Sequence, residues 1–132
     1  MLWEDRVTMA VGKVLSGKIY DVAGVRLSAV SAGIRYQNRL DLVLIELTEE
    51  SKSAGVFTKN AFCAAPVVVA KSHLSSNDPR VLIINTGNAN AGTGDSGLQD
   101  ALQCCQIVAE CTGLDIQEAV SYTHLRAHET LR

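Results

Sequence analysis

Short apolar runs separated by polar turns make up much of the chain from residue 22 to residue 85. Five of them are predicted to be strands, at residues 25–34, 41–47, 54–58, 65–71 and 81–85. The second run, DLVLIEL, is almost continuous, which is typical of a buried strand and too short for a helix. Pro66 stands at the start of the fourth run, where a strand loses least from a missing amide donor.

The pattern then changes to a helical period. One apolar stripe recurs at helical spacing and consists of Leu98, Ala101, Leu102, Cys105, Val108 and Ala109. Ser96 followed by Gln99 is a capping box, which predicts the start of the helix, and Gly113 predicts its end. Asp115 and Glu118 repeat the cap spacing, so we expect a second, short helix there. Strands followed by a helix predict a layered α/β (α+β) domain rather than a strict βαβ alternation.

Composition and charge narrow the class of protein. The chain has 132 residues, enough for one domain, and only 5% are aromatic, so the core must be built from aliphatic side chains. A net charge of −2 without a block of like charges excludes a nucleic-acid footprint and an anionic-membrane anchor. No run approaches the ~18 apolar residues that a membrane span needs, and the N-terminus lacks the layout of a signal peptide. The expected location is therefore the cytoplasm.

Cysteines and histidines do not predict a metal site. The cysteines lack paired CxxC spacing, and those in the predicted helix are expected to behave as small apolar side chains; the set is Cys63, Cys104, Cys105 and Cys111. His124 and His128 would share one helix face, but the glutamate of an HExxH zinc motif is absent. His73 follows a predicted strand and is expected at the surface.

The most informative segment connects the last predicted strand to the helix. Residues 85–94 read NTGNANAGTG, with three glycines and three asparagines in ten residues. Such a loop bends tightly and needs positions with positive φ. Its amide side chains can satisfy the loop's own backbone or offer donors to a ligand. The segment is thus either a plain strand-to-helix connection or the wall of a site, whose candidate residues are Asn85, Asn88, Asn90 and Thr93.

Residues 92–97, GTGDSG, also spell the GxGxxG pattern of dinucleotide-binding loops. In those loops the glycines directly follow the strand, so that a pyrophosphate meets the helix N-terminus. Here several residues separate Asn85 from Gly92, and no clear partner strand ending in an acidic residue follows. A nucleotide-binding module remains an alternative. Titration with NAD or ATP would test it, because only a nucleotide-binding module should show saturable binding. A Walker loop is excluded because no Gly-Lys-Ser/Thr follows.

Three ordered blocks of sequence resemble the bifunctional ornithine/glutamate N-acetyltransferases of arginine biosynthesis. They are VAGVRLSAVSAGIRYQNRLDLVLIEL at 22–47, AGVFTKNAFCAAPVVVAKSHL at 54–74 and VLIINTGNANAGTGDSGLQDA at 81–101. The resemblance implies that residues 19–120 are the N-terminal part of the acetyltransferase domain. Residues 1–18 have only weak patterning and are expected to form a mobile leader. It also implies a sandwich of sheets between helices, the type shared by N-terminal-threonine acetyltransferases and aminopeptidases, here truncated.

The resemblance implies a self-cleaving precursor. The threonine exposed by the cut carries the acetyl group from N-acetylornithine to glutamate, its own α-amine can serve as general base, and a Thr-Gly pair forms the oxyanion hole. Some members also accept acetyl-CoA, and none of this chemistry needs a metal or a bound cofactor. No threonine here has the cleavage context, and Thr86-Gly87 belongs to the loop rather than to the oxyanion block. We therefore assign no catalytic residue and expect this fragment to be inactive alone.

The family pattern stops near residue 121. Residues 121–130 read SYTHLRAHET, which resembles a translated cloning adapter, so residues 121–132 are predicted to be a non-native tail. The implied partners are the missing remainder of the precursor, the substrates N-acetylornithine and glutamate, and other chains of a homo-oligomer or two-chain assembly. Alone, the chain is expected to be poorly soluble or partly molten, because its strands would have open edges. An acyl hydrolase of the same fold and a non-catalytic interaction domain remain alternatives.

Overall fold

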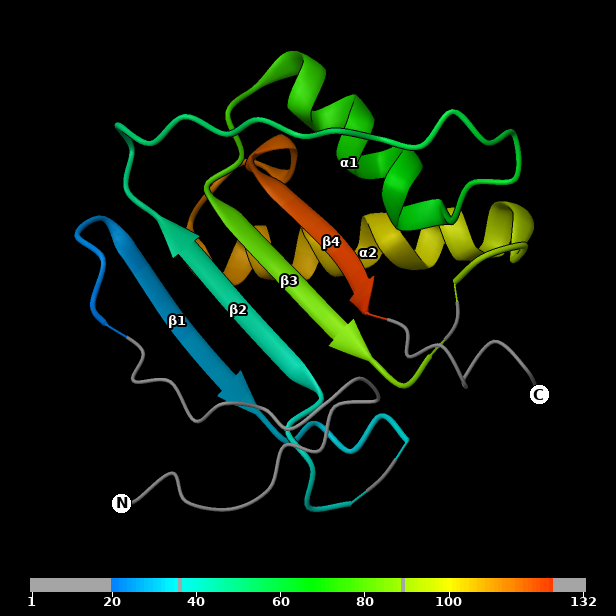
Figure 1. Cartoon of the computed structure of the whole chain (residues 1–132), viewed down its shortest axis with the longest axis horizontal. Helices are drawn as coiled ribbons and strands as arrows, with labels where there is room; N and C mark the ends of the chain where they lie inside the picture. The colour runs from blue at the N-terminus through cyan, green and yellow to red at the C-terminus, as the bar shows by residue number, and fades with distance from the viewer. Residues whose placement is uncertain (1–19, 36, 89, 125–132) are drawn as a thin grey trace.

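The computed structural model describes residues 20–35, 37–88 and 90–124, and contains one sheet with helices on one side (Figure 1). The predicted leader at residues 1–18 lies outside the described residues. Along the chain the elements are β1 (Val25–Val30), β2 (Leu42–Leu47), α1 (Ala65–Ser76), β3 (Val81–Thr86), α2 (Gly94–Thr112), the 3-10 helix η1 (Ile116–Glu118) and β4 (Ala119–His124). A mixed α/β fold, as expected, is confirmed.

The strands lie side by side in the order of the sequence, β1-β2-β3-β4. β1 pairs with β2, and β2 with β3, in antiparallel register, whereas β3 and β4 are parallel and are joined through α2. The segment β3-α2-β4 is therefore a βαβ unit. The sequence analysis found no clear partner strand ending in an acidic residue; β4 is a partner strand, but it ends in His124 and carries no acidic residue.

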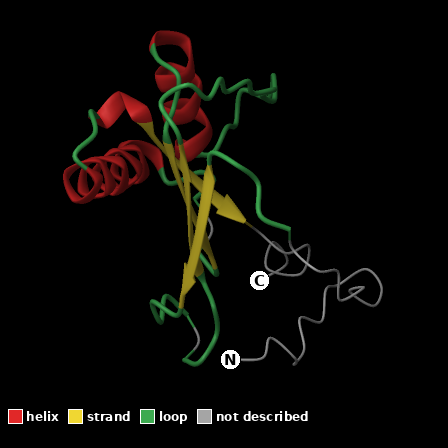
Figure 2. Cartoon of the chain, turned by 90° about the vertical axis from the view of Figure 1, so that its left-hand side faces the viewer, coloured by secondary structure: helices red, strands yellow, loops and turns green. Residues whose placement is uncertain are grey.

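The two faces of the sheet differ in what covers them. Val81 and Ala119 point to the same side as Ile83 and pack against α1 and α2, whose buried members include Val69, Ala101 and Cys105. Figure 2 shows the helices gathered on one side of the strands. The register places the alternate residues on the other side, which we call the open face: Val25, Leu27, Ala29, Val43, Ile45, Leu47, Leu82, Ile84, Thr86, Val120 and Tyr122.

The run at residues 65–71 forms α1 rather than the predicted strand. Pro66 lies in the first turn of this helix, where its fixed φ is favourable and its missing N–H is not needed. Val69, Ala70 and His73 are buried along one side of the helix. A short β-branched run has no decisive period of its own, so packing against β4 and α2 overrides its strand propensity.

Other boundaries were only partly predicted. The strand expected at residues 54–58 is absent, because no described strand lies beside this segment to pair with it. The first strand ends at Val30 rather than at residue 34. The helix begins at Gly94, so the Ser96 capping box was wrong, and the Ser96 hydroxyl instead donates to the Thr93 carbonyl at 3.0 Å. Gly113 ends α2 in the left-handed conformation, and Asp115 with Glu118 caps η1, as predicted.

Two side-chain expectations also need correction. His73 is buried rather than at the surface, and its Nδ1 lies 2.7 Å from the Ala119 carbonyl oxygen, which ties α1 to the start of β4. Cys105 is fully buried as expected, and burial raises the pKa of its thiol, but Cys104 and Cys111 are exposed. In the part of the chain that the structure describes, no helix is both long and apolar enough to span a membrane.

Asp41 holds the connection between β1 and β2. It is 4% exposed, and its carboxylate accepts hydrogen bonds from the backbone N–H groups of Ala32 at 2.6 Å and Ile34 at 2.7 Å. Its carbonyl accepts a hydrogen bond from the Thr86 N–H at 2.9 Å, which links this turn to the end of β3. Burial alone would raise the pKa of Asp41, but the backbone donors favour the charged form and the net pKa is lowered.

We expect the protein to lose stability in acid through Asp41. Because folding lowers its pKa, the contribution is fully present above the unfolded value of about 3.8 and is lost as the pH falls through the folded value. Asp41→Asn should be less stable at neutral pH and should lack this part of the acid loss, since an amide NH₂ group replaces one acceptor. Urea unfolding between about pH 7 and pH 2 measures both effects, with the exposed Asp21→Asn as control. An unchanged acid dependence in Asp41→Asn would contradict this role.

Candidate functional site

The candidate site lies where the parallel strands β3 and β4 end and α2 begins. In open α/β sheets, ligands bind outside the carboxyl ends of parallel strands, close to the N-terminus of the connecting helix. Gly87, Asn88 and residues 90–93 form this connection in the described structure. The β3–β4 register places Asn85 directly opposite Thr123, so both side chains point to the helix-covered side of the sheet.

The four candidate residues are joined with Thr123 in one set of hydrogen bonds. The Thr123 hydroxyl donates to Asn85 Oδ1 at 2.9 Å and accepts a hydrogen bond from Asn90 Nδ2. Asn88 Nδ2 donates to Asn90 Oδ1 at 3.3 Å, and Thr93 Oγ1 donates to the Asn90 carbonyl at 3.1 Å. We call Asn85, Asn88, Asn90, Thr93 and Thr123 the polar cluster. The loop therefore has an internal hydrogen-bond network, which is the scaffold role that its sequence allowed.

The polar cluster is suited to binding rather than to proton transfer. Amides and hydroxyls are uncharged donors and acceptors at neutral pH, so none of these side chains is a general base of useful strength. Within the cluster, Asn85 uses its carbonyl oxygen and not its NH₂ group. That leaves two amide donors for another partner, which suits a carbonyl or carboxylate oxygen.

Glycines let the backbone of this loop bend. Gly87 directly follows β3 with φ +97°, and Gly92 has φ +72°, so both take the left-handed conformation that the sequence predicted. At Gly92 a Cβ atom would also lie 2.5 Å from Phe62 Cζ, closer than side-chain atoms can pack. The loop therefore needs glycine here both for its turn and for contact with another segment.

Thr123 was missed by the sequence analysis because it falls in the predicted non-native tail. Its position opposite Asn85 depends on β4, which no pattern in the sequence predicted. The prediction that residues 121–132 are non-native stays a prediction, since the described part of this segment, residues 121–124, belongs to β4. The His128 side chain and that of His124 lie outside the described part.

The GxGxxG reading is not favoured by this geometry. Although β4 supplies the partner strand, residues 87–93 separate β3 from α2, and Gly94 is already the first residue of the helix. Gly97 is buried in the first helical turn against the Thr93 side chain. A dinucleotide loop needs its glycines at the end of the strand, where the backbone can approach a pyrophosphate.

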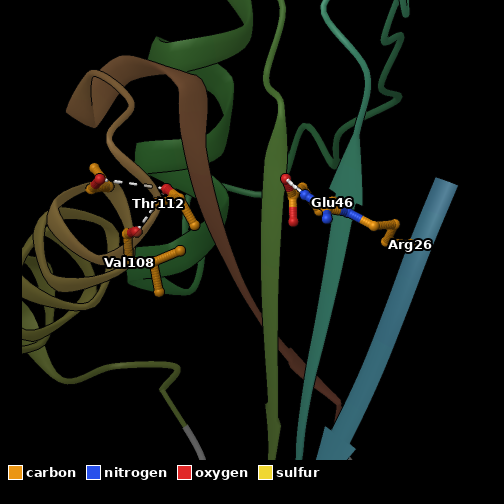
Figure 3. A network of polar contacts seen from close by, with 5 residues as sticks. Arg26, Glu46, Val108 and Thr112 are labelled. Carbon is orange, nitrogen blue, oxygen red and sulfur yellow. Dashed lines mark hydrogen bonds and ion pairs between the residues drawn. The ribbon is translucent and has the colours of Figure 1, made fainter. Parts of the chain in front are cut away.

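Other polar contacts lie away from this site. Arg26 and Glu46 form an ion pair across β1 and β2, near the residues that pair with the start of β3 (Figure 3). At the far end of α2, the Thr112 hydroxyl donates to the Val108 carbonyl at 2.7 Å (Figure 3). Both contacts are local to single elements or neighbouring strands, so we assign them structural roles. No group of three or more potential metal ligands gathers among the described residues.

Comparisons with known proteins define the class first. The fold matches the solved ornithine acetyltransferase from Mycobacterium tuberculosis, complexed with ornithine, with a TM-score of 0.73 and 34% identity, over 78% of this chain and 57% of that one. It is thus the fold of part of an acetyltransferase. Residues 26–123 match the ArgJ family, and the chain belongs to this family.

Curated relatives agree with this assignment. The arginine biosynthesis bifunctional protein ArgJ of Psychrobacter arcticus is 49% identical over 81% of this chain and 26% of its own length. The protein of that name from Methylococcus capsulatus is 51% identical over 73% of this chain and 23% of its own length. The chain therefore spans about a quarter of the curated relatives that it matches.

Proposed function

We propose that this chain is the N-terminal part of an enzyme of arginine biosynthesis that transfers an acetyl group from N-acetylornithine to glutamate. The observation that carries the proposal is the family match at residues 26–123. This range includes most of the sheet, both helices and the whole Asn-rich loop. A relative of the same fold was solved with ornithine bound. Under this proposal the enzyme works in the cytoplasm as a two-chain or homo-oligomeric assembly.

Within that enzyme, the polar cluster forms one wall of the active site. Its role is to orient a substrate through uncharged hydrogen bonds, with the NH₂ group of Asn85, which the polar cluster does not use, as the first candidate donor. The nucleophile and the oxyanion hole belong to the part of the enzyme beyond the matched residues, since no residue here has their sequence context. The chain alone should therefore show no acetyl transfer, and acetyl-CoA remains a second donor to be assayed beside N-acetylornithine.

The proposal is tested by restoring the missing part. Residues 20–120 would be joined to the remainder of the Psychrobacter arcticus relative in place of its own N-terminal segment. We expect this joined protein to transfer acetyl from N-acetylornithine to glutamate and to support growth of a bacterium that lacks its own enzyme without added arginine. The chain alone and the remainder alone should do neither. A folded joined protein without activity would refute the proposal.

Two comparisons sharpen this experiment. Asn85→Ala in the joined protein should lower kcat/KM by about tenfold, as expected for one lost hydrogen bond to a substrate, whereas Gln103→Ala removes an exposed amide of α2 and should have no effect. A second joined protein, with the junction after Thr123 instead of after Val120, tests the prediction that the tail is non-native. If residues 121–123 are non-native, the junction after Val120 gives the more active protein.

A further inference from the structure

We propose that Phe62 is a positioning residue. Through its contact with Gly92, it holds the Asn-rich loop at residues 87–93 in the conformation that binds substrate. This inference rests on the proposed function for its catalytic consequence, but its structural basis does not depend on Thr123 or on the predicted tail. It concerns the long connection between β2 and α1, residues 48–64, which crosses α1 in the view of Figure 1. We call its part at residues 51–62 the strap.

The contact between the strap and the loop is direct. The Phe62 ring lies against the Cα side of Gly92, since a Cβ atom there would be 2.5 Å from Cζ, 3.3 Å from Cε1 and 3.4 Å from Cε2. Two residues further on, Ala64 and Ala91 form an antiparallel bridge. The Ala65 N–H then donates to the Asn90 carbonyl at 3.4 Å. The segment that ends in Phe62 thus touches the loop between the two polar-cluster residues Asn90 and Thr93.

Packing into the core does not account for Phe62. Its side chain remains 69% exposed, so that burial of the ring contributes little to the stability of the fold. The backbone around it is nevertheless fixed by local bonds. The Phe62 N–H donates to Asn60 Oδ1 at 3.0 Å, and the Cys63 thiol lies 2.6 Å from the Asn60 carbonyl oxygen. An exposed aromatic held in place by a local turn and seated on a glycine is a support for that glycine.

The strap is also attached at its other end. Lys52 Nζ lies 2.6 Å from Asp78 Oδ2, and this hydrogen bond holds the pKa of Asp78 below its ordinary value. The Ser53 hydroxyl donates to the Pro79 carbonyl at 3.2 Å, and Gly55 lies against Leu74 of α1. Because the strap is tied to the start of β3 and to α1, Phe62 presses on Gly92 from a fixed position rather than from a free loop.

Loss of the Phe62 ring should loosen the loop around Gly92. The Asn90 carbonyl accepts from both Ala65 N–H and the Thr93 hydroxyl, so a shift at Gly92 moves Asn90 and Thr93 together. Gly92 has φ +72°, a conformation that several neighbouring backbone states can replace once nothing presses on it. Phe62→Ala should therefore leave the fold intact while the loop becomes more mobile.

The first measurement is hydrogen exchange on the full chain and on the joined protein. Phe62→Ala should speed exchange of backbone amides at residues 90–97 by about tenfold and leave residues 42–47 of β2 unchanged. Phe62→Leu, which keeps an apolar side chain at the same place, should restore most of the protection. Val56→Ala is the matched control, because Val56 lies on the same strap and is fully exposed. Unchanged exchange at 90–97 in Phe62→Ala would overturn the proposal.

Kinetics of the joined protein separate positioning from a merely structural role. Phe62→Ala should lower kcat by roughly 10- to 100-fold, as for a misplaced binding group, with the melting temperature nearly unchanged and Phe62→Leu close to the parent. Gly92→Ala should also impair the loop, and adding Phe62→Ala to it should relieve part of the loss, since the new methyl group then meets no ring. Strictly additive losses would count against the contact. An inactive joined protein that still shows the exchange change would refute the proposed function and not the role of Phe62.

Discussion

Gly97→Ala is expected to destabilise the protein, although alanine is the better helix former. Gly97 lies in the first turn of α2, where exchanging glycine for alanine in an open helix would gain up to ~1 kcal/mol. Here, however, the added Cβ would lie 1.7 Å from Thr93 Oγ1 and 2.5 Å from Thr93 Cβ. A hydroxyl can rotate away, but Thr93 Cβ moves only with its backbone. Overpacking of this kind typically costs about 1–3 kcal/mol, so the clash outweighs the propensity.

The sign of this effect is the test. Urea unfolding should give a loss of about 1–2 kcal/mol for Gly97→Ala in the Thr93 background. In a Thr93→Gly background the obstacle is gone, and the same change should become neutral or stabilising. Gly94→Ala serves as a second reference, because its Cβ would meet nothing within 4 Å and only the positive φ of +60° opposes it. Equal losses from Gly97→Ala in both backgrounds would exclude the Thr93 clash as the cause.

Those elements that were predicted correctly have a pattern that does not depend on distant contacts. β2 and β3 are nearly continuous apolar runs, and both lie within one residue of their predicted bounds. The stripe of α2 has a full helical period over several turns, which explains why only its first residues were misplaced. α1 failed because a run of seven residues with three valines has no period to decide between strand and helix, and its Pro66 fits the start of either.

The site was predictable in its residues and not in its assembly. Asn85, at the end of β3, lies within eight residues of Asn88, Asn90 and Thr93 in the following loop, so their closeness follows from the sequence alone. Two partners of this loop come from elsewhere: Thr123 through the register of β4, and Phe62 through the path of the strap. Neither the register of a parallel pair nor the seat of an exposed ring on a glycine has a local sequence signal. His73 was misplaced for a related reason, since its burial depends on α1 packing against β4.

The open face of the sheet predicts that the chain associates with itself when it is expressed alone. All of its residues except Thr86 are apolar or aromatic. The face is covered at β4, where Val120 is only 1% exposed. Near β4 a groove lined by Ile45, Leu82, Val120 and Tyr122 is bordered by the start of the strap and by Leu74. Toward β1 the face is barer, and Leu27 remains 59% exposed on a strand with an unpaired edge among the described residues. An exposed, apolar edge strand favours pairing between chains.

We therefore expect residues 1–132 expressed alone to self-associate, and Leu27→Lys to reduce this several-fold. The lysine places a charge on the open face next to the edge, which opposes both apolar contact and strand pairing between chains. Ser28→Lys is the matched control, because it adds the same charge to the same strand and points to the opposite side. Sedimentation velocity over a range of concentrations would show larger species for the parent and for Ser28→Lys than for Leu27→Lys. If the parent chain stays monomeric and melts in one sharp cooperative transition, the open face does not cause self-association. The chain would then be stable without the rest of a family precursor.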